Sequence, residues 1–218
     1  MGLFGSFIRS FGKKDNDGDG PRQLNHPRDL QVGDIVKFGF TPLQGISNES
    51  FTVKQIFTHD LGDPRKNQTF FQLQGADSYH RLRVGEERGI EFVELSLAVF
   101  PETVEQIFDI EAFGAIFEGD SVNHQLQRIA EPDAVSGWTA PLYRQESAQQ
   151  AYAYKGDYRN TAIPSELGGA EEFDYYVLVS DARKHSVRME VYDGGRTDVF
   201  LNARLDDSAI DELWAAGQ

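Results

Sequence analysis

Five histidines and two adjacent pairs of glutamates are the side chains with which this sequence could carry out acid–base or metal chemistry. The histidines stand singly, without the H-E-x-x-H spacing that places two imidazoles on one metal ion. The sequence also has no G-x-S-x-G motif and no P-loop. The pairs Glu86-Glu87 and Glu171-Glu172 are typical of solvated charge in so acidic a chain. We therefore predict no catalytic residue, no metal site and no cofactor.

An aromatic cluster in the second half of the chain has two interpretations. The residues that we single out in it are Trp138, Tyr143, Tyr152 and Tyr154. Tyrosine-rich sheets can present a binding face for a peptide or a glycan, because each ring offers apolar area together with a hydroxyl group. The same rings can instead fill a core, with their hydroxyls reaching its rim. Both interpretations stay open at this point.

Residues 1–14 form a basic amphipathic arm, whose apolar side chains recur at helical spacing and whose charges are all positive. The residues predicted to contact a membrane or a partner are Leu3, Phe4, Phe7, Ile8, Arg9, Phe11, Lys13 and Lys14. In such segments apolar burial adds to attraction by anionic lipid, so the arm is predicted to bind an anionic membrane surface. Docking on a protein partner, docking on the body of the chain, and disorder are the alternatives.

The composition excludes several classes of function. The formal net charge of −14 argues against nucleic acid as a partner, because phosphate binding needs clustered Lys and Arg. The chain has no cysteine, which excludes disulfides, thiol catalysis and thiolate metal sites. The sequence has no apolar run long enough to span a bilayer, and the arm lacks the continuous apolar centre of a secretory signal. We expect a cytoplasmic protein, peripheral to the inner membrane if the arm binds lipid.

The same pattern of apolar and polar residues occurs twice in the sequence, in residues 70–108 and in residues 175–214. Leu82 aligns with Val187 at an offset of 105 positions, and the offset becomes 106 after the next glycine turn. A single insertion in a hairpin loop explains this change, since loops tolerate insertions that strands do not. The pattern therefore predicts an internal repeat.

Both copies alternate apolar and charged residues, which predicts antiparallel strands with one face on a core and the other in water. Both copies then change to helical spacing, which predicts a short helix at each end. The apolar residues of these two predicted helices are Val104, Ile107 and Phe108, and Ile210, Leu213 and Trp214. The predicted fold is mainly β (α+β), with two pseudo-repeated antiparallel modules that are barrel-like or curled sheets.

The predicted organisation is an arm at 1–14, a flexible linker at 15–29, a first β module at 30–110, a bridging hairpin and linker at 111–136, and a second β module at 137–218. The first module should open with a strand over Leu30–Gly39, in which Gly33 and Asp34 make a tight turn or bulge. Residues 110–129 are predicted to form a hairpin, because Phe113, Ala115 and Phe117 alternate towards a Gly-Asp turn.

The strand motifs resemble an uncharacterised bacterial family of small β modules. They are L-x-V-G-D-x-V-x-F from Leu30, F-T-V-K-Q-I-F from Phe51, F-F-Q-L-Q from Phe70 and R-L-R-V from Arg81, and a later run from Glu172 to Phe200 resembles the same kind of module. Some members are encoded beside PspA-type phage-shock proteins and small membrane proteins. The resemblance implies an accessory role in envelope maintenance and carries over no catalytic residue.

These observations favour a non-enzymatic interaction or adaptor protein that docks through residues 1–14 on a protein partner or on an anionic membrane. The alternative is a hydrolase or a small-ligand-binding protein with its site in the cleft between the two modules. A cleft lined by His and acidic side chains from both halves would favour this alternative. Edge strands of such modules could also pair to form a homodimer.

Overall fold

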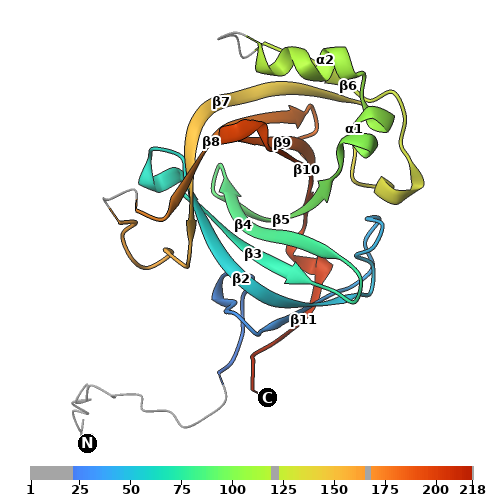
Figure 1. Cartoon of the computed structure of the whole chain (residues 1–218). Coiled ribbons are helices and arrows are strands. Elements are labelled where there is room, and N and C mark those ends of the chain that lie inside the picture. Colours follow the sequence, from blue (N-terminus) through green and yellow to red (C-terminus); the bar gives the residue numbers. More distant parts are fainter. Residues whose placement is uncertain (1–21, 119–122, 165–167, 218) are drawn as a thin grey trace, which may run out of the picture.

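Eight antiparallel strands close into one barrel in the computed structural model, which describes residues 22–118, 123–164 and 168–217 (Figure 1). The barrel strands are β2 (Ser50–Asp60), β3 (Gln68–Gln74), β4 (Tyr79–Glu87), β5 (Ile90–Val99), β7 (Leu142–Lys155), β8 (Ala170–Ser180), β9 (His185–Tyr192) and β10 (Thr197–Leu205). Around the ring their order is β2-β3-β4-β5-β10-β9-β8-β7, and the pairing of β7 with β2 closes it. The prediction of a mainly β protein is therefore confirmed.

The two predicted modules contribute four barrel strands each. Strands β2 to β5 come from the first, and β7 to β10 come from the second. They meet along two strand pairs, β5 with β10 and β2 with β7. One continuous sheet thus runs through both stretches, and the space inside the barrel is lined by both.

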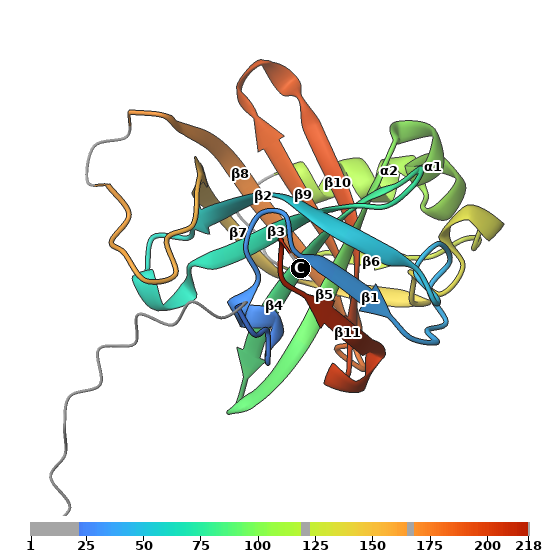
Figure 2. The same ribbon diagram turned by 90° about the horizontal axis from the view of Figure 1, so that it is seen from below.

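Three shorter strands extend the sheet beyond the barrel. Strand β1 (Ile35–Phe38) pairs with the first part of β2, and β11 (Ile210–Trp214) pairs with β1, as Figure 2 shows. Strand β6 (Gln125–Gln127) pairs with the first part of β7. The strand predicted over Leu30–Gly39 is shorter than expected, but Gly33 does form the predicted turn, with a positive φ of 96° that favours glycine.

The helix predicted at the end of the second copy is wrong. Residues 207–209 make a single 3-10 turn, and the chain then continues as β11. Its spacing of apolar residues suits a helix, but the unpaired edge of β1 offers Ile210–Trp214 a ladder of backbone hydrogen bonds. Tertiary pairing therefore overrides the local pattern.

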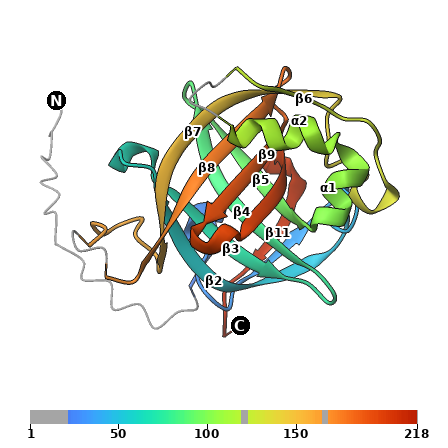
Figure 3. The same cartoon turned by 45° about the horizontal axis from the view of Figure 1, so that its top comes forward.

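The helix predicted at the end of the first copy is confirmed as α1 (Pro101–Ile107), which buries Val104 and Ile107. The hairpin predicted for residues 110–129 is wrong, because this stretch forms α2 (Ile110–Gly114) and a 3-10 turn, η3 (Ala115–Phe117), before β6. The buried side chains Phe113 and Ile116 and the partly buried Phe117 follow i, i+3, i+4 spacing, which is helical. Figure 3 shows α1 and α2 outside the barrel, close to β6.

Further 3-10 turns are η1 (Pro27–Asp29), η2 (Pro64–Lys66), η4 (Asp133–Val135), η5 (Asp193–Gly195) and η6 (Asp207–Ala209). Among the described residues, no helix is long and apolar enough to cross a membrane.

The main apolar core lies outside the barrel wall. Outward-facing side chains such as Leu82, Val187 and Leu201 belong to one buried cluster with residues of α1, α2 and β1. Trp138 and Tyr143 are fully buried in this cluster. The opposite, inward face of the strands is also enclosed, and this face positions the candidate site.

Candidate ligand pocket in the barrel

The charged residues that alternate with the apolar ones on β4, β5, β9 and β10 point into the barrel rather than into water. The contact between Arg81 on β4 and Glu190 on β9 shows this, because these strands are not neighbours in the sheet and their side chains meet across the interior. Arg83, Glu94 and Arg188 share this inward face. The predicted water-facing side of both copies is therefore wrong: closure of the barrel buries it.

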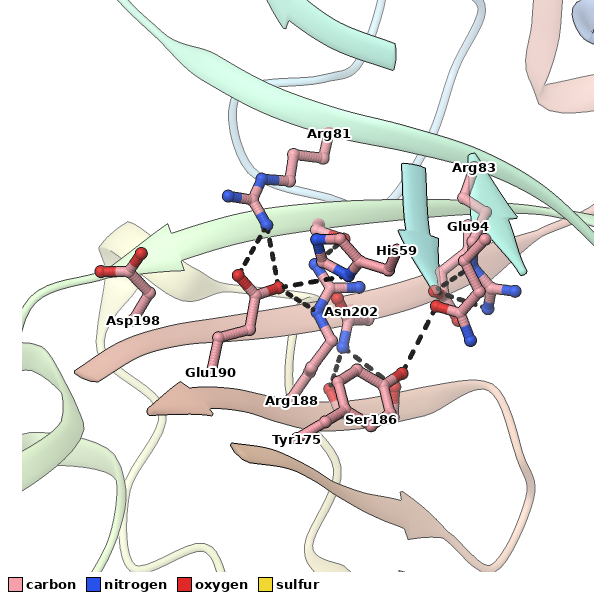
Figure 4. A network of polar contacts seen from close by, with 12 residues as sticks. His59, Arg81, Arg83, Glu94, Tyr175, Ser186, Arg188, Glu190, Asp198 and Asn202 are labelled. Carbon is pink, nitrogen blue, oxygen red and sulfur yellow. Dashed lines mark hydrogen bonds and ion pairs between the residues drawn. The ribbon is translucent and has the colours of Figure 1, made fainter. Parts of the chain in front are cut away.

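A charged cluster, made of His59, Arg81, Arg188, Glu190 and Tyr192, lies inside the barrel. Figure 4 shows the first four of these side chains. Glu190 is fully buried at its centre. Its carboxylate accepts hydrogen bonds from Arg81 Nη1 at 2.9 and 3.2 Å and from the Tyr192 hydroxyl at 2.9 Å. Arg188 Nε lies 3.0 Å from Glu190 Oε1, and His59 Nδ1 lies 4.0 Å from the same oxygen. These contacts hold a buried carboxylate between two guanidinium groups.

The electrostatics of the cluster fix its protonation state. Burial alone would raise the pKa of Glu190, but the guanidinium groups of Arg188 and Arg81 outweigh it and lower this pKa to about 2. Burial lowers the pKa of His59 to about 3, although the charge of Glu190 opposes this shift. Near neutral pH, Glu190 is therefore ionised and His59 is neutral.

A second ion pair lies next to this cluster, towards one end of the barrel. Glu94 Oε1 accepts hydrogen bonds from Arg83 Nε at 3.0 Å and from Arg83 Nη2 at 2.8 Å. Arg204 Nε lies 3.8 Å from Glu94 Oε2, and Arg204 also pairs with Glu87 at the rim. Burial would raise the pKa of Glu94, but the surrounding guanidinium groups lower it overall. Glu94 is thus ionised as well.

Beside this pair the barrel opens into a pocket of about 490 Å³, which we call the arginine pocket. The residues that characterise it are Arg83, Glu94, Tyr175, Arg188, Asn202 and Arg204. They come from β4, β5, β8, β9 and β10, so both halves of the chain build it. The rim carries further charged residues, which are Lys66, Glu86, Glu87, Glu146 and Arg183.

Asn202 supplies a polar group without a partner in the wall of the arginine pocket. Its side chain is only 2% exposed, and its Nδ2 donates to Ser186 Oγ at 3.1 Å. Its Oδ1 is buried and accepts no hydrogen bond from any residue that the structure describes. A buried acceptor without a donor is unfavourable, so a ligand that brought an N–H or O–H group to this oxygen would stabilise it.

Two smaller pockets lie towards the opposite end of the barrel, since they are lined by residues from the first halves of β4 and β10, whereas the arginine pocket is lined by residues from the second halves. One measures about 290 Å³ and includes Tyr79, Phe100 and Phe200. The other measures about 190 Å³ and includes His59 and Lys155. The charged cluster separates both from the arginine pocket.

The four aromatic residues singled out in the sequence do not form one exposed face. Trp138 donates from its indole nitrogen to the carbonyl of Gln44 at 3.0 Å, and the Tyr143 hydroxyl accepts from the Ala140 backbone. Both rings are fully buried. Tyr152 and Tyr154 lie farther along β7, where it pairs with β2.

The arm residues Leu3, Phe4, Phe7, Ile8, Arg9, Phe11, Lys13 and Lys14 lie outside the described part of the chain. Sequence reasoning missed the arginine pocket as a site, and it interpreted two of its rim residues, Glu86 and Glu87, as solvated charge. The available signal was the presence of Arg, Glu and Asn at alternate positions on paired strands, which also fits a solvated sheet face.

Comparison with protein-family models, curated proteins and solved structures finds no match to this chain.

Proposed function

We propose that this protein binds a small polar molecule in the arginine pocket. An eight-stranded barrel is just wide enough to be filled by side chains or to hold one small ligand. Here side chains fill the middle, and a pocket of about 490 Å³ remains at one end, within the usual range for ligand sites. The observation that carries the proposal is the buried Asn202 Oδ1 in the wall of this pocket, which lacks a donor among the described residues.

Binding fits the electrostatics better than a hydrolytic reaction does. Glu190 and Glu94 are held ionised by guanidinium groups, and His59 is enclosed and neutral. A general acid or base must exchange a proton near the working pH, which the lowered pKa values of these three groups disfavour. Both halves line the pocket, as expected for the small-ligand alternative derived from the sequence.

A thermal-shift screen of small polar compounds on the full chain, followed by calorimetry of the hits, tests this proposal. The blocking variant is Ser147→Trp, because Ser147 lines the pocket at its partly exposed edge on β7. The matched control is Ala148→Trp, since the next residue on the same strand points to the opposite face and is exposed. Binding should survive in the control and be lost in Ser147→Trp. Equal binding in both variants would place the site elsewhere.

We also propose, as a second candidate, that residues 1–14 dock on an anionic membrane or on a protein partner. The support is the arm's amphipathic spacing, which carries Arg9, Lys13 and Lys14 but no acidic residue, and the resemblance to modules encoded beside membrane-stress proteins. Co-sedimentation with anionic liposomes tests it by comparing the full chain with a deletion of residues 1–14. Equal sedimentation of the two chains would exclude the arm as the anchor.

We further propose that the two halves of the barrel are pseudo-repeats. The predicted offset of 106 positions maps Ser96 onto Asn202, and these two residues are direct partners in the β5–β10 pair. If a twofold rotation relates the two halves, its axis must pass through a pair of residues that the rotation exchanges. Ser96 and Asn202 are such a pair. An experimental structure tests this, because β4 and β5 should superpose on β9 and β10 with offsets of 105 and 106.

A further inference from the structure

We propose that the ligand of the arginine pocket is a small organic monoanion, a carboxylate whose neighbouring carbon carries a hydroxyl donor. This inference rests on the proposed binding function and adds the chemical class of the ligand. Three features support it: the charge balance inside the barrel, the position of Asn202 near a guanidinium group, and the balanced charges at the rim.

The enclosed part of the barrel has an excess of one positive charge. Three guanidinium groups point into it, from Arg81, Arg83 and Arg188, against the two carboxylates of Glu94 and Glu190. An uncompensated charge in such a weakly polarisable interior is unfavourable, so a bound anion would stabilise it. One negative charge is enough to balance the excess.

The other charged residues near the two ends do not change this balance. At the arginine pocket, Arg204 pairs with Glu87, and the remaining rim residues are two cations and two carboxylates. At the opposite end, Arg196 pairs with Asp198 at 3.7 Å. The excess therefore stays with the groups inside, two of which, Arg83 and Arg188, also line the arginine pocket.

The Asn202 side chain lies near one of these guanidinium groups, that of Arg188. Ser96 is the direct cross-strand partner of Asn202, so their Cβ atoms lie about 5 Å apart. Arg188 Nη2 lies 3.5 Å from Ser96 Oγ, which brings the end of its guanidinium group close to the Asn202 amide. A ligand whose anionic group contacts Arg188 therefore needs its donor close to that group to reach Asn202 Oδ1. A 2-hydroxy carboxylate has this arrangement.

The charge balance favours a ligand with a single negative charge. At the rim, Glu86, Glu87 and Glu146 are matched by Lys66, Arg183 and Arg204, so the rim adds no net positive charge. A nucleotide or a tricarboxylate would bring several negative charges to an excess of only one positive charge. The additional charges would stay uncompensated, which disfavours such ligands.

A matched set of four probes tests the ligand class by calorimetry on the full chain. The probes are 2-hydroxyhexanoate, hexanoate without the donor, 1,2-hexanediol without the charge, and citrate with extra charges. The hydroxy acid should bind most tightly, and loss of the donor or of the charge should weaken binding about tenfold or more, as expected for charge-assisted hydrogen bonds. Citrate should bind more weakly than the hydroxy acid.

Two variants separate the contributions. Asn202→Leu removes the acceptor at similar volume, so hydroxyhexanoate and hexanoate should then bind equally. Glu94→Gln raises the excess positive charge by one, so it should tighten binding of every anionic probe and of citrate most, while 1,2-hexanediol is unaffected. The comparison of the four probes on the unmodified chain keeps the inference testable if either variant fails to fold.

The outcomes distinguish the inference from the proposed function. If 1,2-hexanediol or other neutral compounds bind as tightly as the hydroxy acid, and Ser147→Trp abolishes that binding, the pocket is a ligand site but its anionic specificity is wrong. If neither the probes nor any compound of the wider screen binds, both proposals fail. Hydroxy-acid binding that is unchanged in Glu94→Gln would also overturn the inference.

Discussion

Lowering the pH from 7 to 5 should destabilise this protein by about 2 kcal/mol through His80 alone. His80 lies outside the barrel, between the rings of Phe51 at 5.3 Å and Trp138 at 5.6 Å, and is 4% exposed. Neither of its ring nitrogens forms a hydrogen bond with the described residues. Burial lowers its pKa from 6.5 to about 4, and the Ser96 backbone opposes this only in part. The folded protein therefore keeps this imidazole neutral.

The sign of the effect follows from where the proton binds. Below pH 6.5 the unfolded chain protonates His80 while the folded chain does not, so stability present above pH 6.5 is lost as the pH falls towards 4. Each pH unit in this window costs about 1.4 kcal/mol, which gives about 2 kcal/mol at pH 5. His59 should add to the loss in the same direction, because burial also lowers its pKa, to about 3.

Urea unfolding at pH 7 and pH 5 measures this effect in the full chain, in His80→Phe and in His26→Phe. The first variant keeps an aromatic ring between Phe51 and Trp138 but removes the proton site. The second is the control, since His26 is a partly exposed residue beside Glu91. His80→Phe should remove about 2 kcal/mol of the pH dependence, whereas His26→Phe should leave that His80 contribution in place. A pH dependence unchanged in His80→Phe would refute the reasoning.

Urea unfolding at pH 7 can check the expected change in the free energy of unfolding for three further substitutions. Glu190→Gln should destabilise the fold by about 3–5 kcal/mol, because it leaves two buried guanidinium groups without their shared carboxylate; no loss would mean that water compensates them. Gly137→Ala should cost about 2–4 kcal/mol, since φ is +80° and a Cβ atom would meet the Pro42 carbonyl oxygen at 2.3 Å. Gly45→Ala is its control, with the same φ, no atom within 4 Å and an expected loss of about 1 kcal/mol. Trp138→Ala should cost about 3–5 kcal/mol, and a loss below 1 kcal/mol would contradict its place in the core.

Local patterns in the sequence predict the hairpins well. Alternation around Leu82 and Val187 identifies β4 and β9, and the helical spacing after Pro101 identifies α1. The same kind of pattern fails where a distant strand decides the outcome. The apolar residues of 210–214 have helical spacing, but this segment pairs with the edge of β1 and forms a strand.

The candidate site could not be predicted because its location depends on closure of the barrel. Alternation around Arg83 and Arg188 shows that one strand face is charged, but an open sheet would expose that face and a closed barrel encloses it. Closure depends on the pairing of β2 with β7, which lie far apart in the chain and carry no local signal for each other. A buried, unsatisfied oxygen such as that of Asn202 exists only in the folded barrel.

Nuclear magnetic resonance of the Asn202 side-chain amide tests ligand binding in the arginine pocket most directly. The resonance can be assigned by its loss in Asn202→Leu and followed as 2-hydroxyhexanoate is added to the full chain. Our account predicts a saturable shift of this signal, with the same midpoint as the heat of binding, that disappears in Ser147→Trp. Binding heat without any shift of the Asn202 signal would place the ligand outside the barrel and contradict the account.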